Sequence, residues 1–196
     1  MKSKNLLLIV IVGVILLLGG CGCSGYNSMV KLDENVKNKW NNVQSDYQRR
    51  ADLIPNLVNT VKGAANFEQE TLTRLVEARA KATSVQVDPT NLTPEKLAEF
   101  QQAQAGVSSS LGRLLAVVEN YPDLKANQNF RDLQAQLEGT ENRIKVSRND
   151  FNAAVQGYNS TVRTFPNNIF ANMFGFQVKS GFTADPGSER APNVQF

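Results

Sequence analysis

The most reactive side chains of this chain belong to two cysteines, Cys21 and Cys23, which stand directly after an apolar run. The 196 residues include no histidine. Without imidazole, the chain cannot form a Ser-His-Asp or Cys-His nucleophilic site, an HExxH zinc site, or a histidine-ligated iron or copper centre. We therefore predict no catalytic residue, no cofactor and no metal site, and a protein that is not an enzyme.

Carboxylates are the other groups with potential chemistry, but their spacing matches no common metal or phosphate motif. The sequence has no DxD pair, no EF-hand loop and no GxxxxGK[ST] string. One ExxE pair, Glu138 and Glu141, could hold a weakly bound divalent ion on a helix. Since it has neither a second such pair nor a histidine, we interpret it as structural or solvated.

Residues 1–20 have the layout of a signal peptide or a membrane anchor. Two lysines among the first five residues precede an apolar stretch from Leu6 to Leu18, which only Gly13 interrupts. That stretch is shorter than the roughly 20 residues of a membrane-spanning helix, and it fits the apolar region of a signal peptide better. The net charge of +3 falls to about +1 without those lysines, too little to attract nucleic acid.

The string Leu18-Gly19-Gly20-Cys21 resembles the bacterial lipobox. By that resemblance, Cys21 is lipidated, becomes the new N-terminus after cleavage, and opens a short lipidated linker, residues 21–25. The alternative is an uncleaved membrane helix from about Asn5 to Gly22. Both predict a protein of the bacterial cell membrane, lipid-anchored or single-pass, whose body lies outside the cytoplasm.

These candidate groups must be positioned by helices, because apolar residues recur at helical spacing from Tyr26 to Phe165. Pro55 falls inside the first helical pattern, so we expect a kink there or a restart with Asp52 as N-cap. Two series of seven-residue spacing mark one face of that segment: Met29, Val36, Val43, Arg50 and Leu57, and Tyr26, Trp40, Tyr47, Ile54 and Val61, the second broken only by Asp33.

The last helix, from about Asn127 to Phe165, carries the clearest pattern of the chain. It is about 60 Å long at 1.5 Å per residue, so the body should be a rod. A companion series is apolar only at Val155 and Val162, which predicts a polar interior at the other end of the bundle. The main apolar series has members seven residues apart: Phe130, Leu137, Ile144, Phe151, Tyr158 and Phe165.

Two shorter helices are expected between the long ones. One runs roughly from Phe67 to Thr83, with Leu72, Leu75, Val76 and Ala80 inside; the other runs from Thr93, as N-cap, to about Glu119. The fold class is therefore all-α: an elongated antiparallel helical bundle over residues 26–166, behind the N-terminal signal or anchor segment. The composition of residues 167–196, rich in Gly, Pro and Phe, predicts a mostly irregular tail, with Ile169 to Met173 as its one helical stretch.

Five features of the chain together resemble the LemA family of bacterial membrane proteins. They are Trp40 and the strings RRADLIPNLVNTVKG at 49–63, ENYPDLKANQNF at 119–130, LEGTENRI at 137–144 and YNSTVRTFP at 158–166. The resemblance implies an elongated helical bundle behind an N-terminal membrane segment, and no catalytic residue. It also implies candidate partners, since family members are associated with membrane proteases and TPM-domain proteins. The lipobox-like string departs from the simple membrane helix that is usual in the family.

Two clusters are candidate partner-binding sites. Arg49 and Arg50 lie near Pro55, where a guanidinium could grip a carboxylate or a lipid phosphate. The alternative, which we favour for Arg50, is an interior ion pair with Glu141, because a charge on a buried stripe requires a partner. Tyr121 and Asp123 belong to a polar turn that could be a recognition tip, although each residue there also has a structural use: Pro122 stops one helix, and Asp123 or Asn127 caps the next.

These observations favour a membrane-anchored envelope scaffold or adaptor that acts through helical interaction surfaces. Its partners would be the membrane, other envelope proteins or a second copy of this chain in a homo-oligomer, and no nucleic acid. The alternative is a modulator of an envelope protease or signalling sensor, which requires one defined client.

Overall fold

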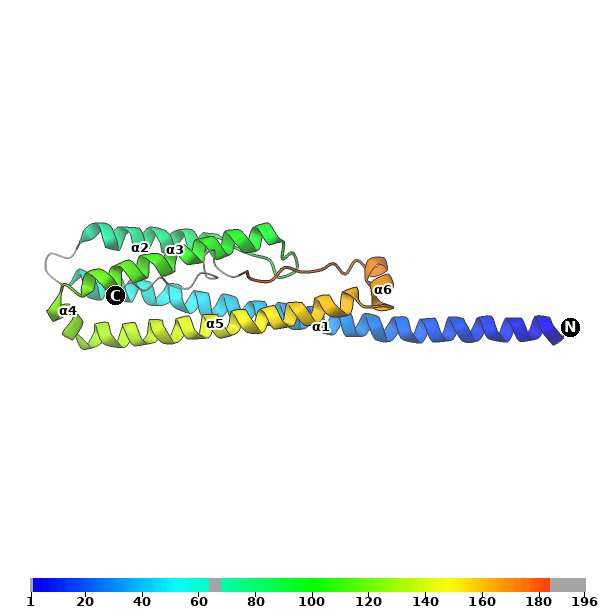
Figure 1. The fold of residues 1–196 in the computed structure, drawn as a ribbon. Coiled ribbons are helices and arrows are strands. Elements are labelled where there is room, and N and C mark those ends of the chain that lie inside the picture. The colour runs from blue at the N-terminus through cyan, green and yellow to red at the C-terminus, as the bar shows by residue number, and fades with distance from the viewer. Residues whose placement is uncertain (1, 64–67, 184–196) are drawn as a thin grey trace, which may run out of the picture.

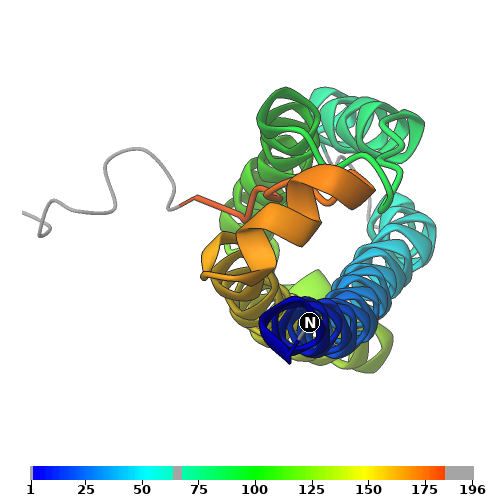
Figure 2. The same ribbon diagram turned by 90° about the vertical axis from the view of Figure 1, so that its right-hand side faces the viewer.

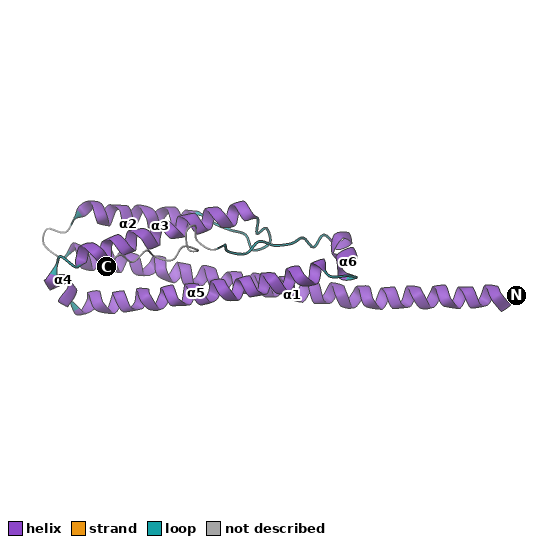
Figure 3. Ribbon diagram, viewed as in Figure 1, coloured by secondary structure: helices purple, strands orange, loops and turns teal. Residues whose placement is uncertain are grey.

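The computed structural model describes the backbone of residues 2–63 and 68–183, and the side chains from residue 22 onward within these ranges. All the regular structure that it describes is helical (Figure 3). The prediction of an all-α fold is therefore confirmed. The helices are α1 (Lys2–Lys62), α2 (Gln69–Ser84), α3 (Pro94–Val118), α4 (Pro122–Ala126), α5 (Gln128–Arg163) and α6 (Asn167–Phe174).

The helices α1, α2, α3 and α5 run alternately in opposite directions and form an elongated antiparallel bundle (Figure 1). Viewed along the axis, α1 lies beside α5, and the α2–α3 hairpin completes the ring (Figure 2). With 61 residues, α1 is about 90 Å long, and its N-terminal part projects beyond the bundle. We call the end from which it projects the anchor end, and the opposite end, where α4 lies, the distal end.

The apolar stripe predicted on the first helix faces the interior of the bundle. Of its two series, only Tyr26 and Asp33, both near the anchor end, keep appreciable exposure. The stripe continues through Pro55 within one helix, so the predicted restart at Asp52 is wrong. Asp52 instead accepts a hydrogen bond of 2.7 Å from the Gln48 amide, one turn earlier on the same helix.

The interior consists of two apolar clusters with a polar layer between them. The anchor-end cluster is built around Trp40, whose ring contacts Phe100 and Phe151 at centroid distances of 5.3 Å. The distal cluster includes Leu57, which lies with Leu114 and Phe130. The prediction of a polar interior at this end is therefore wrong, because the α2–α3 hairpin supplies the apolar side chains that the companion series of α5 lacks. The polar layer contains Arg50, Gln104 and Thr140.

Helix ends agree with the sequence where a capping residue sets them. The Thr93 hydroxyl accepts a hydrogen bond from the backbone N–H of Lys96 at 3.4 Å, and the Asn127 side chain accepts one from Phe130 at 3.3 Å. The short α4 was not expected. Other corrections concern side chains that are exposed although their spacing predicted burial: Val76 and Ala80 on α2, and Phe165, which lies beyond the end of α5.

The segment after α6 returns along the bundle without regular structure and is held by two asparagines of α5. Asn152 both accepts from the N–H of Phe182 at 2.8 Å and donates to its carbonyl at 3.1 Å, and Asn159 makes the same pair of bonds to Lys179, both at 2.8 Å. The Phe182 ring stacks on Trp40 at 5.9 Å. Residues 175–183 therefore complete the anchor-end cluster.

Candidate functional site

Arg50 is the buried charge at the centre of the polar layer, with only 2% of its surface exposed. One guanidinium nitrogen, Nη1, donates to Glu141 at 2.6 Å and to the Ser108 hydroxyl at 2.9 Å. The other, Nη2, donates to the carbonyl of Gln104 at 3.1 Å and to its side-chain oxygen at 2.7 Å. The predicted interior ion pair between Arg50 and Glu141 is therefore confirmed.

Two neighbours extend this network. The Tyr47 ring lies 5.0 Å from the guanidinium carbon of Arg50, a cation–π distance. Burial raises the pKa of the Tyr47 phenol, although Arg148 and Arg50 act against that shift. Glu141 keeps 42% of its side chain exposed, so the ion pair joins a fully buried cation to a carboxylate at the bundle surface. Both terminal nitrogens of Arg50 donate to groups of the bundle itself, so the structure supports a structural use of this guanidinium rather than a grip on an external ligand.

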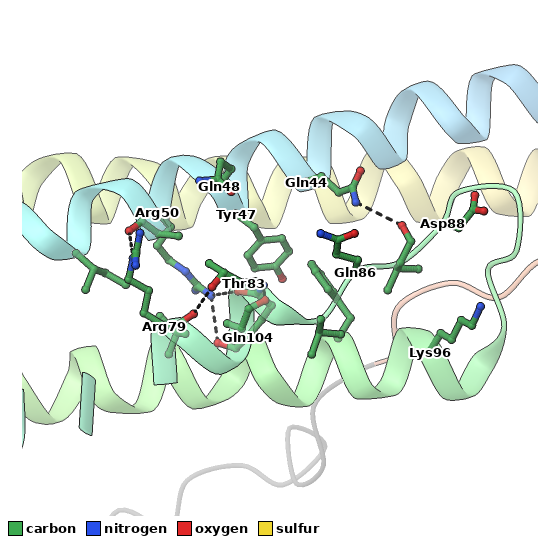
Figure 4. A pocket seen from close by; sticks show the side chains of 17 residues that line it. Gln44, Tyr47, Gln48, Arg50, Arg79, Thr83, Gln86, Asp88, Lys96 and Gln104 are labelled. Atoms are coloured by element: carbon green, nitrogen blue, oxygen red, sulfur yellow. Dashed lines mark hydrogen bonds between the residues drawn. The ribbon is translucent and has the colours of Figure 1, made fainter. Parts of the chain in front are cut away.

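A pocket of about 410 Å³ opens beside this network, between α1, α2, α3 and the α2–α3 loop. Figure 4 shows Arg50, Arg79 and Gln104 at one end of the pocket, and Asp88 and Lys96 toward the other. The Asp88 carboxylate accepts bonds from the hydroxyl and the backbone N–H of Thr90, and these lower its pKa. The walls are mainly polar and offer hydrogen-bond donors and cations rather than a nucleophile paired with a base.

The four predicted partner-binding residues do not form one site. Arg49 is exposed on α1 next to the buried Arg50, whereas Tyr121 and Asp123 lie at the distal end, before and within α4. The distal end of α1, at Lys62, is twelve residues beyond Arg50, which is about 18 Å along the helix axis. Tyr121 is half-buried against the distal cluster and Asp123 is exposed. Arg49 and the α4 turn are thus separate surfaces.

The α4 turn has a defined shape. Leu124 is buried in the distal cluster, and Lys125 forms an ion pair with Glu119 across the turn. The predicted cap on the next helix is Asn127 rather than Asp123, which leaves the Asp123 carboxylate exposed at the tip. The turn therefore presents a charged side chain from a fixed backbone.

The predicted lipidation residue, Cys21, lies outside the described side chains, although α1 runs through its position. The Cys23 thiol is exposed and free. Among the described residues, no helix is both long and apolar enough to cross a membrane. The described residues also contain no group of three or more potential metal ligands.

Sequence reasoning missed Arg79 and Gln104, which hold this region together. Arg79 on α2 donates through Nε to the carbonyl of Ala51 at 2.7 Å. Pro55 is the signal that could have found it, because a proline in a helix leaves the carbonyl four residues earlier without its usual N–H donor. Gln104 gives no such signal, since a single glutamine in an amphipathic helix normally faces solvent.

Comparison with known proteins places the chain in a family. The sequence model of the LemA family matches residues 39–196. The chain is 27% identical to the magnetosome protein MamQ 2 of Paramagnetospirillum magneticum and 25% identical to MamQ of Magnetospirillum gryphiswaldense, with 84% of this chain and 66% of each relative covered. It is 26% identical to the protein LemA of Metamycoplasma hominis, over 74% of this chain and 63% of that protein.

The chain thus spans slightly less than two thirds of the length of these relatives. The family match includes all five features noted in the sequence, with Trp40 near its start. None of these proteins carries the name of an enzyme. Because the family model matches most of its length, the chain belongs to the LemA family.

Proposed function

We propose that this protein is a membrane-anchored adaptor of the bacterial envelope, which presents the faces of a rigid helical bundle to other envelope proteins and performs no catalysis. Membership of the LemA family supports a membrane-associated envelope protein. The observation that carries the finer proposal is the continuity of α1. One helix leads from the apolar N-terminal segment to the distal end of the bundle.

That continuity fixes the position of the distal tip. A helix transmits orientation along its length, so the α4 turn is held at a set height above the anchor, about 60 Å beyond Gly22 at 1.5 Å per residue. The half-buried Tyr121 ring makes this turn the candidate contact surface, since tyrosine is enriched in protein interfaces, and the exposed Asp123 carboxylate beside it would belong to the polar rim.

The polar layer has a structural use in this proposal. Arg50 donates to both Gln104 and Glu141, and the Arg79 guanidinium donates to the backbone of α1. Their hydrogen bonds fix the register of α1, α3 and α5, which is the role best documented for buried polar groups in helical bundles. An adaptor requires this fixed register because its partner recognises the bundle surface.

The test of this proposal is capture of the full chain from chemically cross-linked, intact envelopes of its host. We expect a reproducible set of cross-linked envelope proteins, or a second copy of this chain, that is reduced when Tyr121→Ala and Asp123→Ala are combined. The matched control is Val146→Ala, an exposed substitution on the middle of α5. Recovery of the monomer alone would contradict the proposal.

The nature of the anchor has its own test. We propose lipidation at Cys21, with an uncleaved helix as the alternative. Under the first, Cys21→Ser abolishes incorporation of labelled fatty acid and blocks processing, whereas Cys23→Ser, two residues away, changes neither. Label in the Cys21→Ser protein, or none in the wild type, would favour the uncleaved helix.

The second candidate function is modulation of an envelope protease or signalling sensor. The pocket beside Arg79 and Lys96 favours it, because a polar pocket of about 410 Å³ whose cations outnumber its one carboxylate, Asp88, could receive an acidic side chain from one defined client. In this case, Lys96→Glu would remove a single captured protein and leave the α4 contacts unchanged.

A further inference from the structure

The anchor end of the bundle is covered by α6, which carries an exposed apolar face. Ile169 and Met173 stand four residues apart, so they lie on the same side of the helix, and the exposed Phe165 lies just before α6 begins. Their exposed fractions are 57%, 66% and 75%. We call these three residues the α6 foot.

Other side chains of α6 pack against α1 and so fix the orientation of the α6 foot. The Phe170 ring packs on α1 at Gly22, where an added Cβ would come within 3.0 Å of it, and Ala171 is buried. Phe174 meets the Tyr26 ring edge-on at a centroid distance of 5.0 Å. Contacts with α1 thus fix α6 against the anchor end, and the α6 foot faces away from the core.

The direction of α6 is as informative as its composition. Seen along the bundle axis, α6 crosses the anchor end, whereas α1 and α5 are viewed end-on (Figure 2). It is therefore transverse to the part of α1 that projects toward the N-terminus (Figure 1). If α1 stands upright on a membrane, α6 lies parallel to the membrane surface.

The height of α6 matches the place where the anchor should enter the bilayer. Gly22 follows the predicted lipidation residue, Cys21, and it also ends the alternative uncleaved helix. Either anchor puts the contact of Phe170 with Gly22 at the bilayer surface. The eight residues of α6 include no charge, only three asparagines beside the apolar side chains. Arg163, exposed in the last turn of α5, is available for lipid phosphates.

We propose that the α6 foot inserts into the bilayer surface beside the anchor, so that the bundle stands on the membrane at two points. The partner is the boundary between lipid headgroups and acyl chains, where interfacial helices bury an apolar face. This inference rests on the proposed membrane anchor. Two contact points would stop the bundle from tilting about a single tether, and they would hold the α4 turn at its full height.

The experiment places a fluorescent amino acid by genetic encoding at Ile169 of the full chain, reconstituted in phosphatidylcholine vesicles. Brominated acyl chains quench fluorophores that enter the bilayer. We expect them to remove most of the emission at Ile169. The matched control is the same fluorophore at Val146, which is 61% exposed and seventeen residues before the end of α5, or about 26 Å away. It should keep its emission.

Each outcome bears on the proposal. If the protein floats with the vesicles but Ile169 is quenched no more than Val146, the α6 foot does not enter the membrane. If the emission of the fluorophore at Ile169 changes with protein concentration but not with bromination of the lipid, the surface binds a second copy of the chain. That result would also overturn the proposal. If the protein does not float at all, the proposed anchor fails instead.

A second variant guards against misfolding caused by the fluorophore. With Ile169→Asp and Met173→Asp combined, and the fluorophore at Phe165, the protein should still float through its anchor while quenching at Phe165 is lost. Unchanged quenching at Phe165 in this variant would contradict insertion of the α6 foot.

Discussion

The Arg79 guanidinium of α2 donates a hydrogen bond of 2.7 Å to the carbonyl of Ala51 on α1. In an unbroken helix this carbonyl would accept from the N–H of residue 55, but residue 55 is proline and has none. The neighbouring helix thus satisfies the group that Pro55 leaves without its intrahelical donor. A proline that could end α1 is tolerated because α2 lies beside it.

Arg79 and Pro55 should therefore be coupled. We predict that Arg79→Ala lowers the free energy of unfolding by about 1 to 3 kcal/mol, because a partly buried carbonyl loses its donor. In a Pro55→Ala background the loss should be smaller, since the new N–H can bond to Ala51. Chemical denaturation of the full chain in mild detergent, run as a double-mutant cycle, measures the difference. Equal losses in both backgrounds would show that the bond does not depend on Pro55.

The ion pair in the polar layer gives a second cycle. Arg50→Ala should destabilise the protein by about 3 to 5 kcal/mol, since it empties a buried site and leaves Gln104 without its donor. Glu141→Ala should destabilise the protein by only about 1 to 3 kcal/mol. The Glu141 carboxylate is half-exposed, so water can take over part of its interaction with Arg50. Denaturation of the double mutant gives the coupling. Additive losses would contradict the pair and would return Arg50 to the candidate partner-binding residues.

The interior of α1 could be predicted from sequence because its cause is local. Seven-residue spacing places Val36, Val43 and Leu57 on one face whatever packs against them. The same stripe holds Arg50, and the cost of an unpaired buried charge then predicts a carboxylate partner on the facing helix. The continuity of α1 at Pro55 could not be predicted in this way, since its donor comes from another helix.

The role of the C-terminal segment was also beyond reach of the sequence pattern. Phe182 follows no helical or strand period, and its burial depends on Asn152 and Asn159, which are bound to the backbone rather than to particular side chains. The α4 turn could be predicted in part. Pro122, which follows the end of α3, and Asn127, which caps α5, are local signals, whereas the burial of Leu124 depends on tertiary packing.

The C-terminal segment should matter for stability although it has no regular structure. Phe182→Ala should lower the free energy of unfolding by about 3 to 5 kcal/mol, because it leaves a cavity beside Trp40. Val178→Ala, an exposed change in the same segment, should stay within about 0.5 kcal/mol. Denaturation of both variants checks this. Similar small losses would place Phe182 outside the cooperative core.

Acid should loosen the same segment through Asp33. Its carboxylate binds Lys37 and Lys179 at 2.9 Å each. Burial opposes its ionisation, but these two lysines outweigh burial and hold its pKa below the usual value. The folded state therefore binds this proton less tightly than the unfolded chain, so the stability from Asp33 is full above about pH 4 and is lost as pH falls further.

We predict that Asp33→Asn lowers the free energy of unfolding at neutral pH by about 1 to 3 kcal/mol, a value between those of exposed and buried pairs. It should also flatten the fall in stability below about pH 4. Thermal unfolding over a pH series, with exposed Glu34→Gln as the control, measures both effects. A variant whose pH dependence matches the wild type would show that Lys179 is not held through Asp33.

We propose that the distal tip of the anchored bundle contacts another envelope protein. Photo-cross-linking in intact envelopes tests this contact, with a photoreactive amino acid encoded at Asp123 and, as the control, at Val146 on the middle of α5. We expect a discrete adduct of higher mass from Asp123 that is absent from Val146 and is lost when residues 1–25 are deleted. No adduct from Asp123, or the same adducts from both positions, would contradict it.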